Sequence, residues 1–224
     1  MTRWLKYGFV LCVAVLLASA SGAATLRVER DGTGDYTTIQ PALDAVAAGD
    51  TVLIGPGEYP EMTNQYLPNA GGWFEVAGCI RVSNITLIGD SAETTLIGPA
   101  VYSGEVNIGI AYPVTGDLRL VNITVMNVNT GCHIDYGRLF VDGCHFEGND
   151  TGIQWYVSGV GGGVWNSYFS SAILYSSGLF FVGSGQGVVI EGCAFEASSL
   201  KFRKSSAPCN TQPPNAAPVL NLAR

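Results

Sequence analysis

The sequence predicts an all-β protein built as a parallel β-helix, in which short strands form stacked three-strand coils behind one short N-terminal helix. The composition favours strands and turns, because 29 residues are glycine and only 13% are charged. Apolar positions recur in a pattern that repeats about every 20 to 26 residues, and this spacing is typical of solenoids. The repeated part shows no 3.6-residue periodicity, which excludes an α-helical solenoid.

Residues 1–20 have the features of a secretory signal peptide, with cleavage expected after Ala20. Arg3 and Lys6 precede the uninterrupted apolar run FVLCVAVLLA, and small residues follow it. This run is about half the length of the roughly 20 residues that a transmembrane helix needs. We therefore expect an exported chain that forms one domain and is not inserted in a membrane after cleavage.

Charge and cysteine content limit the possible partners. The formal net charge is −7, and loss of Arg3 and Lys6 with the signal makes the chain more acidic. Such a surface disfavours nucleic acids and anionic membranes. Five of the six cysteines remain once Cys12 is removed, so at least one thiol is unpaired, and none lies in a CxxC motif. We expect a monomer without a metal or cofactor.

The first elements of the domain are a short helix and a buried strand. Thr37 or Thr38 can cap the helix, and Pro41 is tolerated in its first turn. Apolar residues recur inside it at helical spacing, at Ile39, Leu43 and Val46. Gly49 ends the helix, and Thr51–Ile54 has the character of a buried strand.

Five corners then divide the chain into strands. Each corner is an Asn or Gly, the residues that best tolerate a left-handed backbone, at Asn84, Asn122, Gly143, Asn166 and Gly192. Residues two before, one after and three after each corner are apolar, for example Val141, Cys144 and Phe146, with Ser167 as the single exception. The pattern predicts a strand, a one-residue corner and a second strand in each coil.

A third strand of each coil is predicted from a later apolar alternation. Its pairs are Cys132 and Ile134, Ile153 and Trp155, Ile173 and Tyr175, and Leu200 and Phe202. The wide gap between Asn84 and Asn122 leaves room for an extra coil through Thr95 to Ile110. Stacking of such coils gives a parallel β-helix whose interior consists of columns of equivalent side chains.

The stretch DGTGDYTTIQPALDAVAAGDTVLIGPGEYPE, residues 31–61, resembles the N-terminal signature of the pectin lyase-like right-handed parallel β-helix superfamily. It is similar to the form found in pectin methylesterases, whose G-x-Y-x-E motif matches GEYPE. The resemblance implies a right-handed β-helix over residues 25–203, with the helix covering the strand edge of the first coil. The superfamily includes esterases, hydrolases, lyases and proteins without established chemistry, so activity must be argued from the site.

Ester hydrolysis in pectin methylesterases requires two carboxylates, one as nucleophile or base and one as acid. Residues 148–156, GNDTGIQWY, resemble the family segment that holds the first carboxylate and place Asp150 there. Residues 176–185, SSGLFFVGSG, resemble the segment that holds the second, but Leu179 occupies its position. The alternative role of Asp150 is that of a turn residue bonded to its own backbone.

Two hypotheses for function remain. In the first, the chain is an exported β-helix that binds carbohydrate, or a surface or structural module, without the complete catalytic site of the family. In the second, it is a polysaccharide-processing enzyme, of pectin esterase, lyase or glycoside hydrolase type, with a rearranged site. A lyase needs an Arg or Lys base over a calcium-binding acidic cluster. Arg81 and Arg119 precede their corners, but no repeated aspartates accompany them.

The predicted binding surface consists of outward-facing residues on the two strands that flank a corner. Stacking places Asp142 and His145 beside Trp165 and Tyr168, with Glu191 one coil further. Aromatic rings and carboxylates suit the apolar faces and hydroxyl edges of sugars, so the expected partner is a polysaccharide or cell-surface glycan. The structural alternative is that Trp165 and Tyr168 favour strands and pack along the column.

Cys144 and Cys193 share an inward column, with Ser167 in the coil between them. Strands about 4.8 Å apart put the two cysteines roughly 9 to 10 Å from each other, which is beyond the ~7 Å limit for a disulfide. We expect both to be buried, unpaired thiols.

Residues 204–224 lack the coil pattern and are rich in Pro, Asn and Ala. This composition predicts a disordered tail or a linker.

Overall fold

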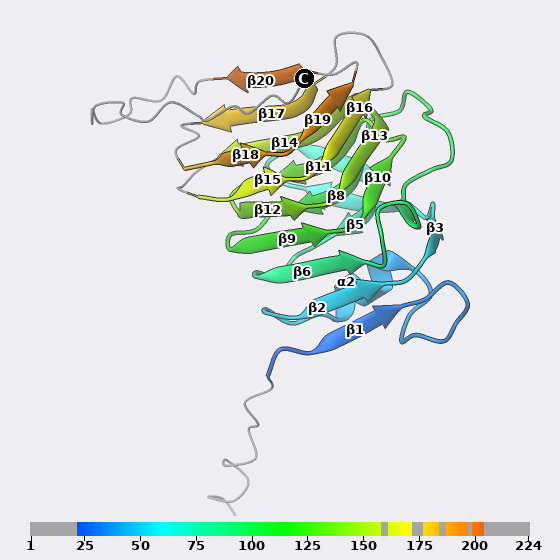
Figure 1. Cartoon of the computed structure of the whole chain (residues 1–224). Coiled ribbons are helices and arrows are strands. Elements are labelled where there is room, and N and C mark those ends of the chain that lie inside the picture. Colours follow the sequence, from blue (N-terminus) through cyan, green and yellow to red (C-terminus); the bar gives the residue numbers. More distant parts are fainter. Residues whose placement is uncertain (1–21, 158–160, 172–176, 184–186, 197–198, 204–224) are drawn as a thin grey trace, which may run out of the picture.

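The computed structural model describes residues 22–157, 161–171, 177–183, 187–196 and 199–203, which wind into a stack of parallel strands (Figure 1). The predicted signal peptide (1–20) and tail (204–224) lie outside the described residues. Within the described part, no helix is long and apolar enough to cross a membrane.

Three sheets form the sides of the stack. Sheet A contains β1 (Thr25–Val28), β2 (Thr51–Ile54), β6 (Ile85–Gly89), β9 (Asp117–Val121), β12 (Arg138–Asp142), β15 (Gly163–Trp165) and β18 (Val189–Glu191). Sheet B contains β3 (Gly57–Tyr59), β7 (Thr95–Ile97), β10 (Thr124–Met126), β13 (His145–Asn149), β16 (Tyr168–Ser171) and β19 (Ala194–Glu196). Sheet C contains β4 (Thr63–Leu67), β5 (Gly72–Cys79), β8 (Asn107–Tyr112), β11 (Thr130–Ile134), β14 (Thr151–Val157), β17 (Ser177–Gly183) and β20 (Ser199–Arg203).

Successive coils visit sheets A, B and C in turn, and each new strand lies beside the equivalent strand of the previous coil. Among the described strands, only β4 and β5 pair antiparallel. The fold is thus all-β, with stacked parallel strands and one short helix, and is consistent with the predicted β-helix.

The helix α2 (Ile39–Ala45) lies against β1, β2 and β5 at the start of the stack. Thr38 occupies the predicted N-cap position but makes no capping hydrogen bond through its side chain, and the helix ends at Ala45, earlier than the predicted Gly49. The buried amide of Gln40 is fixed by the backbone of Cys79, because Cys79 N donates to Oε1 at 2.8 Å and Nε2 donates to Cys79 O at 3.2 Å. The helix therefore covers the apolar interior of the first coils, as predicted.

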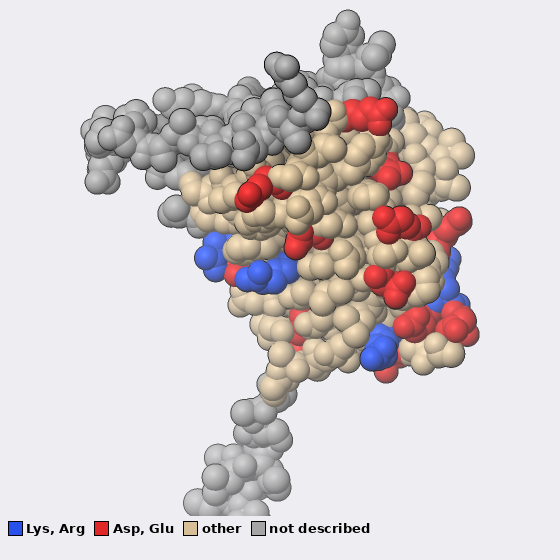
Figure 2. Space-filling model, viewed as in Figure 1, with Lys and Arg blue, Asp and Glu red and all other residues tan. Residues whose placement is uncertain are grey.

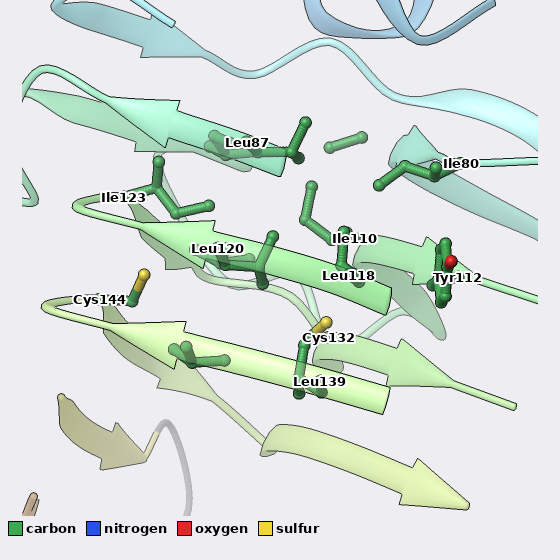
Figure 3. Close-up of a cluster of buried hydrophobic side chains, with 14 of the residues drawn as sticks. Ile80, Leu87, Ile110, Tyr112, Leu118, Leu120, Ile123, Cys132, Leu139 and Cys144 are labelled. Carbon is green, nitrogen blue, oxygen red and sulfur yellow. The ribbon is translucent and has the colours of Figure 1, made fainter. Parts of the chain in front are cut away.

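The core consists of columns of equivalent side chains from successive coils. Sheet A supplies Leu87, Leu120, Val141 and Val164, sheet B supplies Val125, Phe146 and Phe169, and sheet C supplies Ile110, Cys132, Ile153 and Leu179. Figure 3 shows leucines of sheet A pointing into the space shared with Ile110 and Cys132. The rings of Phe146 and Phe169 stack at 5.1 Å, which continues the column on sheet B.

The corner residues adopt the left-handed backbone that the sequence predicts. Their φ angles are 61° at Asn84, 54° at Asn122, 60° at Gly143, 48° at Asn166 and 65° at Gly192. The last four join a strand of sheet A to a strand of sheet B. Asn84 turns a different corner, since it precedes β6 of sheet A, and Leu87 pairs with Leu120 rather than with Val125. The predicted equivalence of Asn84 with the other corners was wrong.

Two further register predictions were wrong. Thr95–Ile97 and Asn107–Tyr112 are not an extra coil, because they are the second and third strands of the coil that begins with β6. In the coil of β15 and β16, the third strand is β17, and Leu179 pairs with Ile153 there. The predicted pair Ile173 and Tyr175 lies outside the described residues.

A glycine column in sheet C makes room for the phenylalanine column of sheet B. Gly131 and Gly152 lie at equivalent positions of β11 and β14. A Cβ on Gly131 would lie 2.8 Å from the Phe146 ring, and a Cβ on Gly152 would lie 2.8 Å from the Phe169 ring. Glycine is needed here because the two sheets approach closely and the interior is fully packed.

Candidate functional site

A cleft of about 270 Å³ opens on the outer face of sheet C. Its polar lining residues are Asn69, Asn129, Thr130, His133, Gln154 and Tyr156, and its apolar lining residues are Ala70, Phe74, Val106 and Ile108. His133 and Gln154 occupy paired positions on β11 and β14, one beside the other. The alternation of side chains along a strand sends both outward, between inward-facing core residues.

Hydrogen bonds connect the polar side chains in a row. His133 Nδ1 lies 3.3 Å from Gln154 Oε1, and Gln154 Nε2 donates to the Tyr156 hydroxyl at 2.8 Å. On the other side of the ring, His133 Nε2 lies 3.0 Å from Asp135 Oδ1, and both side chains are buried. Both ring nitrogens of His133 therefore have protein partners.

The β4–β5 hairpin covers one side of this row. At its turn, Asn69 Nδ2 donates to Asp135 Oδ2 at 3.1 Å, and the Tyr136 hydroxyl donates to Asn69 Oδ1 at 2.7 Å. The hairpin itself contributes Leu67 and Val76 to a small apolar cluster that is separate from the main core. This cover explains why His133 is buried on an outer face.

The cleft offers amide, hydroxyl and imidazole groups beside an apolar wall. A general base must have a nitrogen or oxygen within reach of the substrate proton, whereas both nitrogens of His133 are already hydrogen-bonded. In the part of the chain that the structure describes, no group of three or more His, Cys, Asp or Glu could hold a metal ion. No Lys or Arg occurs among the lining residues. The arrangement fits an uncharged ligand with many hydroxyl groups.

Asp150 and Leu179, the two positions that the methylesterase resemblance singles out, do not form one site, since Asp150 lies in the turn before β14 and Leu179 faces the core from β17. Asp150 precedes β14 and is half-buried, and its Oδ2 accepts a hydrogen bond from Asn129 Nδ2 at 3.3 Å. Leu179 is fully buried in the core column beside Ile153. A carboxylate at position 179 would face the apolar interior, where an unpaired charge is strongly unfavourable.

The surface predicted from the sequence is assembled as expected in space. Asp142 pairs with Trp165, Trp165 pairs with Glu191, and His145 pairs with Tyr168. These residues lie on the outer faces of sheets A and B, on either side of the corners. Figure 2 shows acidic side chains over much of this face, together with basic ones on its left side, at its right edge and near the bottom. Binding of a glycan by these residues stays a prediction.

The aromatic members of this surface have partners within the protein. Trp165 stacks on Phe140 at 6.5 Å with the planes 9° apart. Tyr168 contacts His145 edge to face at 5.6 Å and donates its hydroxyl proton to Glu196. The bond to Glu196 raises the pKa of Tyr168. These contacts agree with the structural alternative, in which the rings pack along the columns.

The cysteine prediction is confirmed in its main part. Cys144 and Cys193 are both free thiols, and Ser167 Oγ accepts a hydrogen bond from Cys144 N at 3.2 Å in the coil between them. Burial raises the pKa of Cys144 to about 12. Cys193 is only half-buried, because the last described coil has no further coil above it within the described residues.

No protein-family model matches the chain, and a search among curated proteins gives no match.

The sequence contains a signal for the cleft in the outward-facing residues of the third strands. His133, Gln154 and Tyr156 are polar or amphipathic residues at outward positions of adjacent third strands. Their burial depends on the β4–β5 hairpin. Residues 62–80, which contain this hairpin, lack the apolar pattern by which the coils are recognised. The β4–β5 hairpin was not predicted, and without it the sequence gives no indication that the outward-facing His133 is buried.

Proposed function

We propose that this chain is an exported, right-handed β-helix of the pectin lyase-like type that binds a polysaccharide or cell-surface glycan through the cleft on sheet C. Right-handed winding is supported by a general rule, since crossovers between parallel strands of one sheet are right-handed in about 98% of cases. The signature in residues 31–61 and the helix α2 over the first coil support the superfamily.

The observation that carries the proposed function is a cleft lined by a row of hydrogen-bonding side chains and by apolar residues. The Tyr156 hydroxyl accepts from Gln154, so its own proton is free for a ligand oxygen. Phe74 and Val106 give the opposite side of the cleft an apolar surface. Sugars present both hydroxyl edges and apolar C–H faces, and this cleft can contact both.

Catalysis is the weaker proposal. The contact between His133 and Asp135 resembles the base and orienting carboxylate of many hydrolytic sites, but both nitrogens of the ring are occupied. Asp150 has no second carboxylate at position 179. A polysaccharide-processing enzyme would have to use a rearranged site in which His133 releases Gln154 or Asp135.

Export rests on the signal-like residues 1–20 and is part of the proposal. Secretion of the full chain, with an N-terminus at Ser21 found by sequencing the mature protein, is the expected result.

The experiment that tests the function is a screen of the purified protein against neutral and acidic polysaccharides, with binding and product release scored together. Binding without release of product supports the proposed binding module, and release of product supports the enzyme. If the protein neither binds nor cleaves any of the polysaccharides, the proposed glycan function is wrong.

A further inference from the structure

The β4–β5 hairpin presents two different faces, because side chains alternate along both strands. Phe74 points to the inner face and lines the cleft. On the outer face, Tyr66 and Trp73 form a cross-strand pair whose ring centroids are 5.5 Å apart, with planes tilted by 56°. Trp73 is 68% exposed and Tyr66 is 46% exposed. Neither ring is needed to fill the core.

The two rings form a continuous apolar surface rather than scattered exposed residues. Single exposed aromatic residues are common and need no explanation, whereas adjoining ones mark binding surfaces. The next cross-strand pair on the same face is Asn64 and Glu75, and both are exposed. The rings are thus bordered by hydrogen-bonding groups, as a sugar ring requires.

The free edge of β4 is not well suited to another protein strand. Arg81 Nη2 donates to the Tyr66 carbonyl oxygen at 3.2 Å and to Gln65 Oε1 at 3.0 Å. A cation on an edge strand, with a backbone acceptor already satisfied, blocks the addition of a strand from a second molecule. The faces of the two rings remain as the surface available for a ligand.

We propose that Tyr66 and Trp73 form a second glycan-binding site, which stacks on sugar rings of an uncharged polysaccharide; this inference rests on the proposed glycan-binding function. The apolar C–H face of a pyranose lies against Trp73, and its hydroxyls reach Asn64 and Glu75. Aromatic surfaces of this kind bind by burial of apolar area, and the polar neighbours orient the ligand.

The charges around the hairpin select against acidic polymers. Glu75 borders the rings, and Asp135 lies beneath the hairpin turn. The cleft lining contains no Lys or Arg, and the Arg81 guanidinium is engaged at the strand edge. The chain as a whole carries a formal net charge of −7. Arg81 is bonded only to uncharged oxygens and keeps its positive charge, so weaker binding of a polymer rich in carboxylates requires that Glu75, Asp135 and the negative net charge outweigh this cation.

Trp73 and Phe74 are adjacent residues that point to opposite faces, so the ring pair and the cleft belong to one hairpin. A long polymer can occupy both sites, whereas a short oligosaccharide fills one at a time. The second site therefore adds to the apparent affinity for polymers and little to that for oligosaccharides.

The test uses the full chain, the variants Trp73→Ala and Tyr66→Ala, and Val101→Ser as a control for loss of an exposed apolar side chain elsewhere. The probes are galactomannan, arabinoxylan, mixed-linkage β-glucan and polygalacturonate, with short oligosaccharides of each. We expect Trp73→Ala to lower the apparent affinity for the uncharged polymers at least about tenfold and that for their oligosaccharides less than about twofold. Val101→Ser should bind like the parent, and polygalacturonate should bind at least about tenfold more weakly.

Other outcomes separate this inference from the proposed function. If well-folded Trp73→Ala and Tyr66→Ala bind the polymers like the parent while Tyr156→Phe binds more weakly, the hairpin site is wrong and the cleft stands. If only the hairpin variants lose affinity, the hairpin site stands and the cleft is wrong. A preference for polygalacturonate overturns the ligand class. An altered mass of Trp73→Ala in light scattering assigns the rings to a protein interface and overturns the inference.

Discussion

His133 Nε2 and Asp135 Oδ1 lie 3.0 Å apart on the outer face of sheet C, and both side chains are buried beneath the β4–β5 hairpin. Two residues that alternate with core residues along a strand would normally face solvent. Here the β4–β5 hairpin shields part of this face from solvent, and Asn69 at its turn donates a hydrogen bond to Asp135. The hairpin, the buried pair and the cleft are therefore parts of one structural unit.

Removal of Asp135 should loosen this unit. In Asp135→Ala, His133 Nε2 and the Asn69 amide both lose a buried partner, and we expect the free energy of unfolding to fall by about 1–3 kcal/mol. Hydrogen exchange should rise in 63–72 more than in β8 or β14. The matched control is Glu105→Ala, which removes an exposed carboxylate and should cost less than about 0.5 kcal/mol. Equal stability of the two variants would show that the buried pair does not hold the hairpin.

The glycine column should be sensitive to a single methyl group. Gly131→Ala places a Cβ against the Gly152 carbonyl and 2.8 Å from the Phe146 ring. Overpacking of this kind costs about 1–3 kcal/mol, which denaturant unfolding can measure. Gly72→Ala serves as the control, because the nearest side-chain atom to its Cβ is 3.8 Å away. The column explanation fails if both substitutions have the same small effect.

The predictions that succeeded from sequence are those that depend on local geometry. Asn122, Gly143, Asn166 and Gly192 were identified because only a few residue types tolerate a left-handed corner. The apolar positions around these corners were found because the spacing of side chains along a strand is fixed. The helix over the first coil was found from the helical spacing of its apolar residues, whereas the predicted end at Gly49 was wrong, because the helix ends at Ala45.

The predictions that failed depend on which segments meet in space. Asn84 has the same local pattern as Asn122 but lies at another corner, and only strand pairing reveals this difference. Ile173 and Tyr175 alternate like the third-strand pairs, yet Leu179 occupies the position beside Ile153. The burial of His133 depends on a hairpin more than fifty residues earlier in the chain. Local patterns carry no information about such long-range contacts.

The buried thiol of Cys144 should make the protein less stable at alkaline pH. Its pKa is raised from 9.0 to about 12 by burial, so the folded state keeps the proton while the unfolded chain releases it. The contribution is fully present below pH 9 and is lost as pH rises toward 12. In Cys144→Ser, for which Ser167 of the next coil is a natural precedent, this loss should be absent.

Denaturant unfolding at pH 8 and pH 10 measures the effect. The parent should lose roughly 1 kcal/mol more than Cys144→Ser between these two values. Groups far from position 144 are the same in both proteins, so their contributions cancel in the difference. Parallel pH profiles of the two proteins would contradict burial of the thiol.

Methyl-esterified pectin should not be de-esterified by this protein. The position of the second carboxylate holds Leu179, which faces the core, and Asp150 alone cannot serve as both acid and base. An assay of methanol release, with a pectin methylesterase as positive control, should give no signal above background. Release that disappears in Asp150→Asn would overturn the prediction and favour the enzyme hypothesis.

Binding of a glycan by the cleft on sheet C can be decided with a pair of isosteric substitutions. Tyr156→Phe removes a cleft hydroxyl, and Tyr168→Phe removes an equivalent hydroxyl from the surface on sheets A and B that the sequence predicts. The measurement is a calorimetric titration of each variant and the parent with the oligosaccharide of the best-binding polymer. We expect Tyr156→Phe to bind about 5 to 10 times more weakly, since one ligand hydrogen bond is lost, and Tyr168→Phe to bind like the parent. Weaker binding by Tyr168→Phe together with unchanged binding by Tyr156→Phe would contradict the account and move the site to the corner of sheets A and B.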